Sequence, residues 1–262
     1  MVELLFVPAL LGYGEAALAY AGEAWHPGRA GRLATWGVRL GWLAQTALIA
    51  VLFARSAGFP WDTWAGTLNL FVWLVVGIYL VWGCRARYRL LGLTIMPLAA
   101  GLLLASWLAG ASATAEAAAY STPFLVFHVG LVLAAFAGLT LAAAMSGLYL
   151  FEERRLKSRK PASLLGRMPS LVTLDTLAAR TVLVSLPALA AGVGLGLVRL
   201  RETGGGFDAL MGASLLTIAV YAAYVLLRVE AGWRGRRAAY VALAGFALVI
   251  VVRLVLPLSH FA

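Results

Sequence analysis

Histidine is the residue whose chemistry is easiest to place in this chain, because it occurs only at His26, His128 and His260. A neutral imidazole can bind a metal through one ring nitrogen, and an imidazole pair is a common way to hold the iron of a haem. His128 and His260 would form such a pair if the chain brought both to one face of the molecule. The elements that place them therefore decide whether this chemistry is available.

The composition predicts an integral membrane protein. Hydrophobic residues make up 63% of the chain and charged residues 12%, compared with roughly half and a quarter in a soluble domain. The net charge of +10 comes from basic residues that border apolar segments, which is typical of membrane orientation and excludes a nucleic-acid partner. The single cysteine, Cys84, excludes a disulfide framework and a two-thiol metal site, and no C-x-x-C-H motif for covalent haem is present.

Eight segments are long and apolar enough to cross about 30 Å of hydrocarbon as helices. They are approximately 2–22, 33–54, 63–83, 90–110, 123–150, 178–199, 209–228 and 238–259. We therefore predict an all-α, polytopic bundle that forms a single membrane domain over residues 1–262. The first segment lacks early basic residues and is expected to be a span and not a cleavable signal. The fifth is longer than a bilayer requires.

The distribution of basic residues predicts the orientation of this bundle. Lys and Arg are concentrated in the loops that follow the first, third, fifth and seventh segments, and the positive-inside rule places these loops in the cytoplasm. Both termini are then outside, and so are His128 and His260. The other loops contain few basic residues, namely Arg55, Arg199 and Arg201.

Small residues recur at every fourth position in the fifth and sixth segments, a pattern that lets helices approach closely in lipid. It predicts a compact bundle and carries no chemistry of its own. The positions are Gly130, Ala134, Gly138, Ala142 and Ser146, and then Ala188, Gly192 and Gly196.

Three further side chains are candidates to line a haem site. Arg253 lies in an apolar run two helical turns before His260, so both project from nearly the same face. It is a candidate to bind a propionate, and the alternative is that it extends to the outer headgroups. Trp61 and Trp64 are expected to anchor the chain at the interface, or else to form an apolar wall for a flat ligand. His26 is expected to be a solvated loop residue.

Four stretches of the sequence carry a family resemblance. They are Phe127-His128-Val129-Gly130, Leu148 to Arg155, Trp233 to Ala239, and Leu258-Ser259-His260-Phe261. With the eight predicted spans, they cover most of the chain. In order and spacing they resemble the cytochrome c assembly proteins, membrane haem handlers that include CcsA-like, CcmC-like and HemX-like branches.

The resemblance implies a haem site and also shows where this chain departs from the pattern. In CcsA-like members, two external histidines that flank a tryptophan-rich loop are the expected axial ligands, and they map onto His128 and His260. This chain has only Gly204 to Ala209 at that loop, with Asp208 as its remnant. It also has Leu227-Arg228-Val229 where an inner histidine is expected. The departures imply one external haem b and favour the smaller HemX-like branch, in the bacterial cytoplasmic membrane.

Two functions are compatible with this interpretation. The first is a haem-binding protein of cytochrome c assembly or haem homeostasis, with the lipid bilayer, haem, and apocytochrome c or other maturation subunits as partners. The second is a non-catalytic regulator or scaffold whose basic segment Arg154 to Arg167 binds a haem-biosynthesis enzyme or an assembly subunit. No nucleophile–base pair is evident, so the protein is not expected to be an enzyme alone. A permease is disfavoured, because no acidic pair lies within a predicted span.

Overall fold

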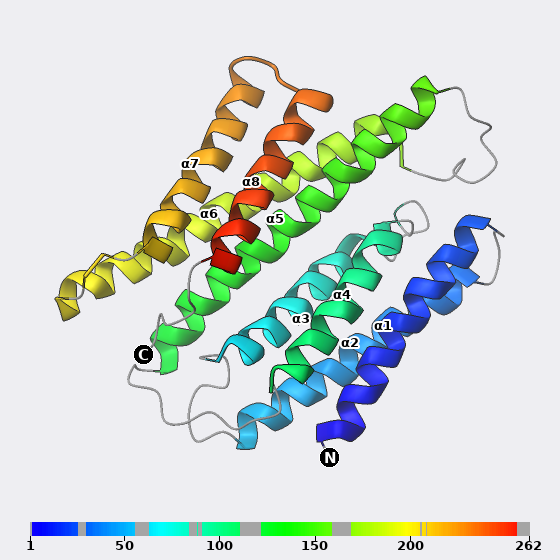
Figure 1. The fold of residues 1–262 in the computed structure, drawn as a ribbon, viewed down its shortest axis with the longest axis horizontal. Coiled ribbons are helices and arrows are strands. Elements are labelled where there is room, and N and C mark those ends of the chain that lie inside the picture. Colours follow the sequence, from blue (N-terminus) through cyan, green and yellow to red (C-terminus); the bar gives the residue numbers. More distant parts are fainter. Residues whose placement is uncertain are drawn as a thin grey trace. The chain divides into compact units, whose positions relative to one another are not determined.

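The structure is a computed structural model that describes residues 2–25, 30–55, 63–83, 88, 91–110, 122–158, 169–204, 206–207 and 209–255. Within these ranges the chain forms eight α-helices and no strand. Figure 1 labels these helices along the ribbon. The helices are α1 Val2–Trp25, α2 Ala30–Arg55, α3 Trp64–Gly83, α4 Gly92–Leu108, α5 Thr122–Lys157, α6 Leu171–Thr203, α7 Ala209–Val229 and α8 Arg236–Val255. The predicted all-α fold is confirmed.

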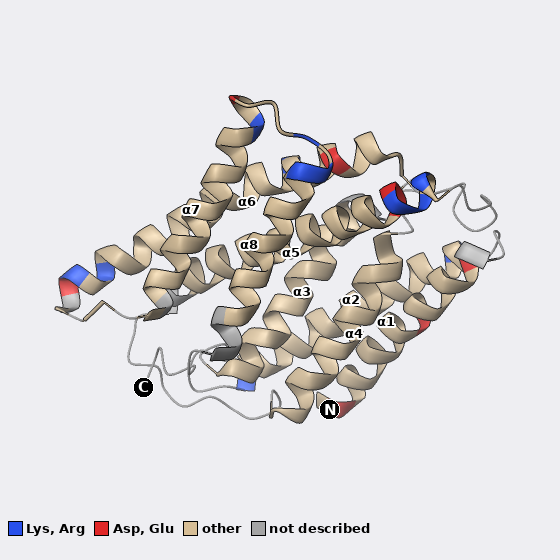
Figure 2. Cartoon of the chain, turned by 45° about the horizontal axis from the view of Figure 1, so that its top comes forward, with Lys and Arg blue, Asp and Glu red and all other residues tan. Residues whose placement is uncertain are grey.

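Six of the described helices, α1, α2, α3, α5, α6 and α7, are long and apolar enough to cross a membrane, and α4 is a shorter apolar helix. The protein is therefore a polytopic helical membrane protein, as predicted. The charged residues lie mostly near helix ends, with long uncharged stretches of helix between them (Figure 2). Which end faces the cytoplasm stays a prediction.

Helices α5 and α6 exceed their predicted spans by the largest margins. Helix α5 has 36 residues, or about 54 Å, which agrees with the expectation that the fifth span exceeds the bilayer. Helix α6 begins at Leu171 because the Ser170 side chain accepts a hydrogen bond from the Thr173 backbone N–H, and it ends at Gly204 with φ +66°. The first turns of α6 therefore precede residue 178, where the apolar segment that predicted this helix begins.

The contacts divide the chain into two compact units. Unit 1 contains α1 to α4, and unit 2 contains α5 to α8. The description below takes each unit by itself, and the single membrane domain stays a prediction.

In unit 1, α1 and α2 touch backbone to backbone. A Cβ atom on Gly12 would lie 2.8 Å from both the Gly37 carbonyl oxygen and the Gly41 Cα. No side chain fits in that space, so these glycines fix how closely the two helices approach. The Glu15 carboxylate, one turn further along α1, lies against Gly37.

A chain of hydrogen bonds joins α1, α2 and α3 in the interior of unit 1. The Tyr13 hydroxyl donates to Gln45 Oε1 at 2.6 Å, and Gln45 Nε2 donates to Asn69 Oδ1 at 2.8 Å. The exposed fractions of these three residues are 0%, 0% and 2%. Buried polar groups of this kind must be paired, and here each helix supplies a partner for the next.

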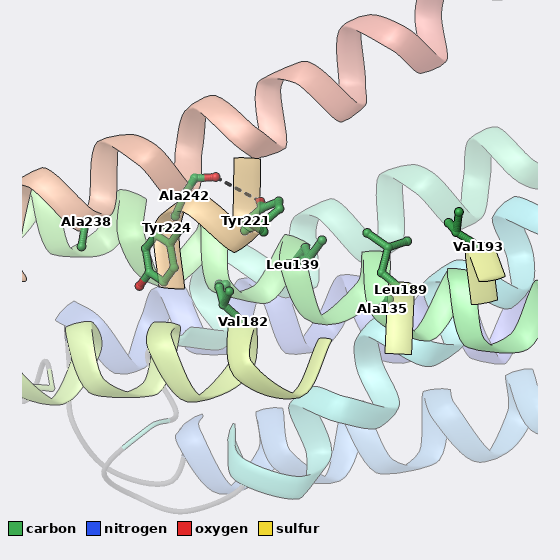
Figure 3. Close-up of a cluster of buried hydrophobic side chains, with 10 residues drawn as sticks. Ala135, Leu139, Val182, Leu189, Val193, Tyr221, Tyr224, Ala238 and Ala242 are labelled. Atoms are coloured by element: carbon green, nitrogen blue, oxygen red, sulfur yellow. Dashed lines mark hydrogen bonds between the residues drawn. The ribbon is translucent and has the colours of Figure 1, made fainter. Parts of the chain in front are cut away.

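The core of unit 2 is an apolar cluster to which all four helices contribute (Figure 3). Helices α5 and α6 meet at two of the small residues noted in the sequence: Gly138 faces Ser185, and Gly192 faces Val132. Gly130 is outside this contact, since nothing lies within 4 Å of a Cβ placed there. The Tyr221 hydroxyl donates to the Ala242 carbonyl oxygen at 3.1 Å and ties α7 to α8.

Candidate haem-binding site around His128

His128 lies in the second turn of α5, and its imidazole is turned toward α6. The ring Nδ1 lies 2.8 Å from the carbonyl oxygen of Gly192. A carbonyl oxygen can only accept, so Nδ1 carries a proton, and in the neutral imidazole Nε2 then carries the lone pair. Histidines that bind metals usually have this arrangement, in which a backbone carbonyl orients the ring and fixes its tautomer.

Gly196, one turn further along α6, makes room for the imidazole. A Cβ atom at this position would lie 2.8 Å from His128 Cε1 and 3.3 Å from Nδ1. Any larger residue would displace the ring. The two glycines predicted as packing residues therefore also serve the histidine, because Gly192 supplies the acceptor and Gly196 supplies the space.

An aromatic ring and a cation complete the surroundings of His128. The Phe124 ring is nearly parallel to the imidazole, with 5.5 Å between ring centroids and 4° between planes. The Arg199 guanidinium lies over the same phenyl ring, with Cζ 5.9 Å from its centroid. Arg199 is also paired with Glu202 at 3.0 Å. The surroundings thus bring together one oriented imidazole, one flat apolar ring and one cation.

Sequence reasoning did not identify Phe124 or Arg199 as part of a site. Arg199 was considered only as a loop charge. The signal that could have found it is its spacing, because Arg199 follows Gly192 and Gly196 by seven and three residues and therefore shares their face of α6.

Most of the other predicted site residues fall outside the described part of the chain. These are Trp61, Asp208 and His260, together with His26. Arg253 lies within α8, but its side chain is not described. Trp64 begins α3 in unit 1 and is 42% exposed. The described residues contain no group of three or more His, Cys, Asp or Glu that could hold a metal. Because His260 lies outside the described residues, its pairing with His128 stays a prediction.

The opposite end of unit 2 holds an ion pair. Arg228 on α7 donates to both Asp175 carboxylate oxygens on α6, at 3.0 and 2.6 Å. The Gly235 backbone N–H donates to the same carboxylate at 2.8 Å. The two side chains are only 17% and 12% exposed. Arg228, which stands where the family resemblance led us to expect an inner histidine, thus ties α7 to Asp175 on α6, and the same carboxylate holds the loop before α8.

The fold and the His128 surroundings define a polytopic helical membrane protein with a preoriented histidine at a helix end. Comparison of its sequence with known proteins identifies the family. A family model described as "Cytochrome C assembly protein" matches residues 61–260, and the chain belongs to that family. The match includes both His128 and His260. No solved structure matches the chain.

Several curated proteins are similar to this chain. It is 28% identical to Protein HemX of Brevibacillus brevis over 60% of its own length and 58% of that protein. It is 25% identical to Protein HemX of Bacillus subtilis, over 82% of this chain and 79% of that protein. It is 23% identical to the cytochrome c biogenesis protein CcsA of Microcystis aeruginosa, over 84% and 82%. The predicted family is therefore confirmed.

Proposed function

We propose that this protein binds one haem b at the external face of the bacterial cytoplasmic membrane and acts in cytochrome c assembly or haem homeostasis. His128 and His260 are the proposed axial ligands. The observation that carries the proposal is the hydrogen bond from His128 Nδ1 to the Gly192 carbonyl, which directs the lone pair to Nε2. Membership of the cytochrome c assembly family supports it.

The residues near His128 fit a haem in chemical type. An imidazole nitrogen binds iron, a phenyl ring packs on a flat macrocycle, and a guanidinium binds a carboxylate. Arg199 and Arg253 are therefore the candidates for the propionates. Trp61, Trp64 and Asp208 are weaker candidates for the remaining wall. In this role the protein binds and orients the haem, and the thiols needed for covalent attachment belong to an apocytochrome.

A spectrum of the purified protein tests the proposal. The wild-type protein should show a reduced-minus-oxidised haem signal, and the His128→Ala/His260→Ala variant should lose it. A haem signal of unchanged size and position in that variant would show that the ligands are elsewhere.

A pair of glycine variants tests the orientation of His128. Gly196→Ala places a methyl group against the imidazole and should weaken haem binding about tenfold, as loss of an orienting contact usually does. Gly194→Ala is the matched control, because a Cβ at Gly194 has nothing within 4 Å. Haem titrations that give equal affinities for the two variants would contradict the proposed ring position.

A second candidate function is a non-catalytic scaffold for a haem-biosynthesis enzyme or an assembly subunit. The observation that favours it is the exposed basic end of α5, which includes Arg154 and Lys157. Pull-down from native membranes with and without neutralised basic residues in Arg154 to Arg167 tests it. A partner profile that is the same for both would count against a scaffold role.

A further inference from the structure

A cluster of arginines surrounds one tyrosine where α5 ends and α8 begins, within unit 2. The Arg236 guanidinium lies over the Tyr240 ring at 5.5 Å, and its Nη2 is 3.5 Å from the Tyr240 hydroxyl. Arg154, from α5, lies close enough to the same hydroxyl to interact with it electrostatically. All three residues are exposed. Two cations from separate helices thus converge on one phenol, and Figure 2 shows the basic residues at these helix ends.

The carboxylates near this cluster are mostly engaged by other cations. Glu152 pairs with Arg155 at 3.4 Å, and Glu153 pairs with Lys157 at 2.8 Å. Asp175 is held by Arg228, as described above.

Four arginines at this end, Arg154, Arg234, Arg236 and Arg237, have no ion pair within the described residues, against one exposed acid, Glu230. Glu153 also interacts with Arg236, and Asp175 with Arg234, but the basic residues at this end outnumber the acidic ones. The cluster therefore has an excess of positive charge that suits an anion.

The position of the cluster indicates which anion. It lies at the ends of apolar helices, beside Trp233, whose ring is 5.8 Å from the Arg237 Cζ. Tryptophan and tyrosine at this level are typical of the headgroup region. After Tyr240, toward its C-terminal end, α8 exposes a stripe of small and apolar residues at helical spacing. This stripe consists of Ala244, Ala247 and Val251.

We propose that Arg154, Arg236 and Tyr240 bind the phosphate of an anionic phospholipid, with an acyl chain along the Ala244–Val251 stripe of α8. The phosphate oxygens accept hydrogen bonds from the two guanidiniums and from the phenol hydroxyl. A free phosphate would satisfy the cluster alone, whereas a phospholipid satisfies the cluster and the apolar stripe together. This site is separate from the His128 region and does not depend on haem binding.

The test uses the full-length protein in nanodiscs made from mixed phosphatidylglycerol and phosphatidylcholine, with bound lipid counted by native mass spectrometry. The wild-type protein should retain phosphatidylglycerol over phosphatidylcholine. Arg154→Gln/Arg236→Gln should lower that preference about 30-fold, since each basic residue near an anionic surface contributes about fivefold. Tyr240→Phe, which keeps both charges and the ring, should lower it by a smaller factor.

Arg39→Gln/Arg201→Gln is the matched control, because it removes two exposed arginines from elsewhere, one of which also lies over an aromatic ring, that of Trp36. It should retain the wild-type lipid preference. Equal preferences in the wild type and in the Arg154/Arg236 variant would overturn the proposal. If that variant fails to fold, an unchanged preference in Tyr240→Phe would overturn it instead.

Two other outcomes would replace a lipid with a different ligand. Displacement of phosphatidylglycerol by millimolar inorganic phosphate would show a site for soluble anions. Co-purification of an acidic protein that depends on Arg154 and Arg236, with an unchanged lipid preference, would show a protein-docking surface. Either result contradicts the lipid assignment.

Discussion

The two units of this protein place their buried polar groups differently. In unit 1 the polar groups form a chain through the interior, from Tyr13 on α1 through Gln45 on α2 to Asn69 on α3. In unit 2 the interior cluster is mostly apolar, and an interhelical hydrogen bond within it runs from the Tyr221 hydroxyl to the Ala242 carbonyl oxygen. The imidazole contact of His128 and the Asp175–Arg228 ion pair lie toward the helix ends.

This difference separates a structural use of polar residues from a functional one. An interior hydrogen-bond chain fixes the register of three helices, because each side chain in it is engaged by the next. Polar groups at helix ends lie near water and headgroups, where a ligand can reach them. The family match begins at residue 61, so α1 and α2, which supply Tyr13 and Gln45, precede it, whereas both histidines lie within it.

The largest effect is expected from the ion pair of unit 2. Asp175→Ala leaves the mostly buried Arg228 without its partner and should destabilise the protein by about 3 kcal/mol. Lys157→Ala is the control, since its pair with Glu153 is exposed at the lysine and should contribute less than about 0.5 kcal/mol. Unfolding in mixed detergent micelles, followed by helix content, measures both.

A double variant separates the ion pair from the packing around it. Asp175→Ala/Arg228→Leu removes both charges and should recover part of the lost stability. If the double variant is less stable than Asp175→Ala, the charge left unpaired is not the cause of the loss.

The next effect is expected at the α1–α2 contact of unit 1. Gly12→Ala forces a methyl group against the Gly37 and Gly41 backbones and should cost about 2 kcal/mol, because backbone atoms cannot rotate away. Gly14→Ala on the same helix meets nothing within 4 Å and should be neutral or slightly stabilising. The same unfolding measurement compares them, and equal stabilities would mean that the two helices are not in backbone contact.

The smallest effect is expected from the interior chain of unit 1. Gln45→Leu leaves Tyr13 and Asn69 without their shared partner and should cost about 1 kcal/mol. Tyr13→Phe/Gln45→Leu/Asn69→Leu removes all three polar groups and should be close to the wild type in stability. A triple variant that is far less stable than the single one would show that the chain contributes stability itself, beyond the cost of leaving groups unpaired.

The number and order of the helices could be predicted from the sequence, because a long apolar segment in a membrane has few alternatives to an α-helix. It was less informative about where the helices end. Hydropathy placed the start of the sixth span at 178, but the Ser170 cap extends α6 back to Leu171. Asp175 therefore lies inside a helix, opposite Arg228, and hydropathy alone could not reveal that pairing.

The candidate site was predictable in part. His128 stands out by its rarity and its place at the start of a long helix. The Gly192 carbonyl, the room left by Gly196 and the approach of Arg199 depend on how α5 and α6 face each other. Small-residue stripes predict that two helices meet, but they do not specify the register in which they meet. For this reason the contacts of His128 had to come from the structure.

The contacts among the four helices of unit 1 also affect the order in which the parts of the protein can assemble. Helix α1 contacts α2 and α4, and α3 contacts the same two helices, so each partner in these contacts is synthesised within the first 110 residues. Chains emerge from the ribosome N-terminus first, and compact parts fold as units. Gln45 can therefore find both of its hydrogen-bond partners before α5 is made, and the helix that carries His128 is made after the interior hydrogen-bond chain of unit 1 can form.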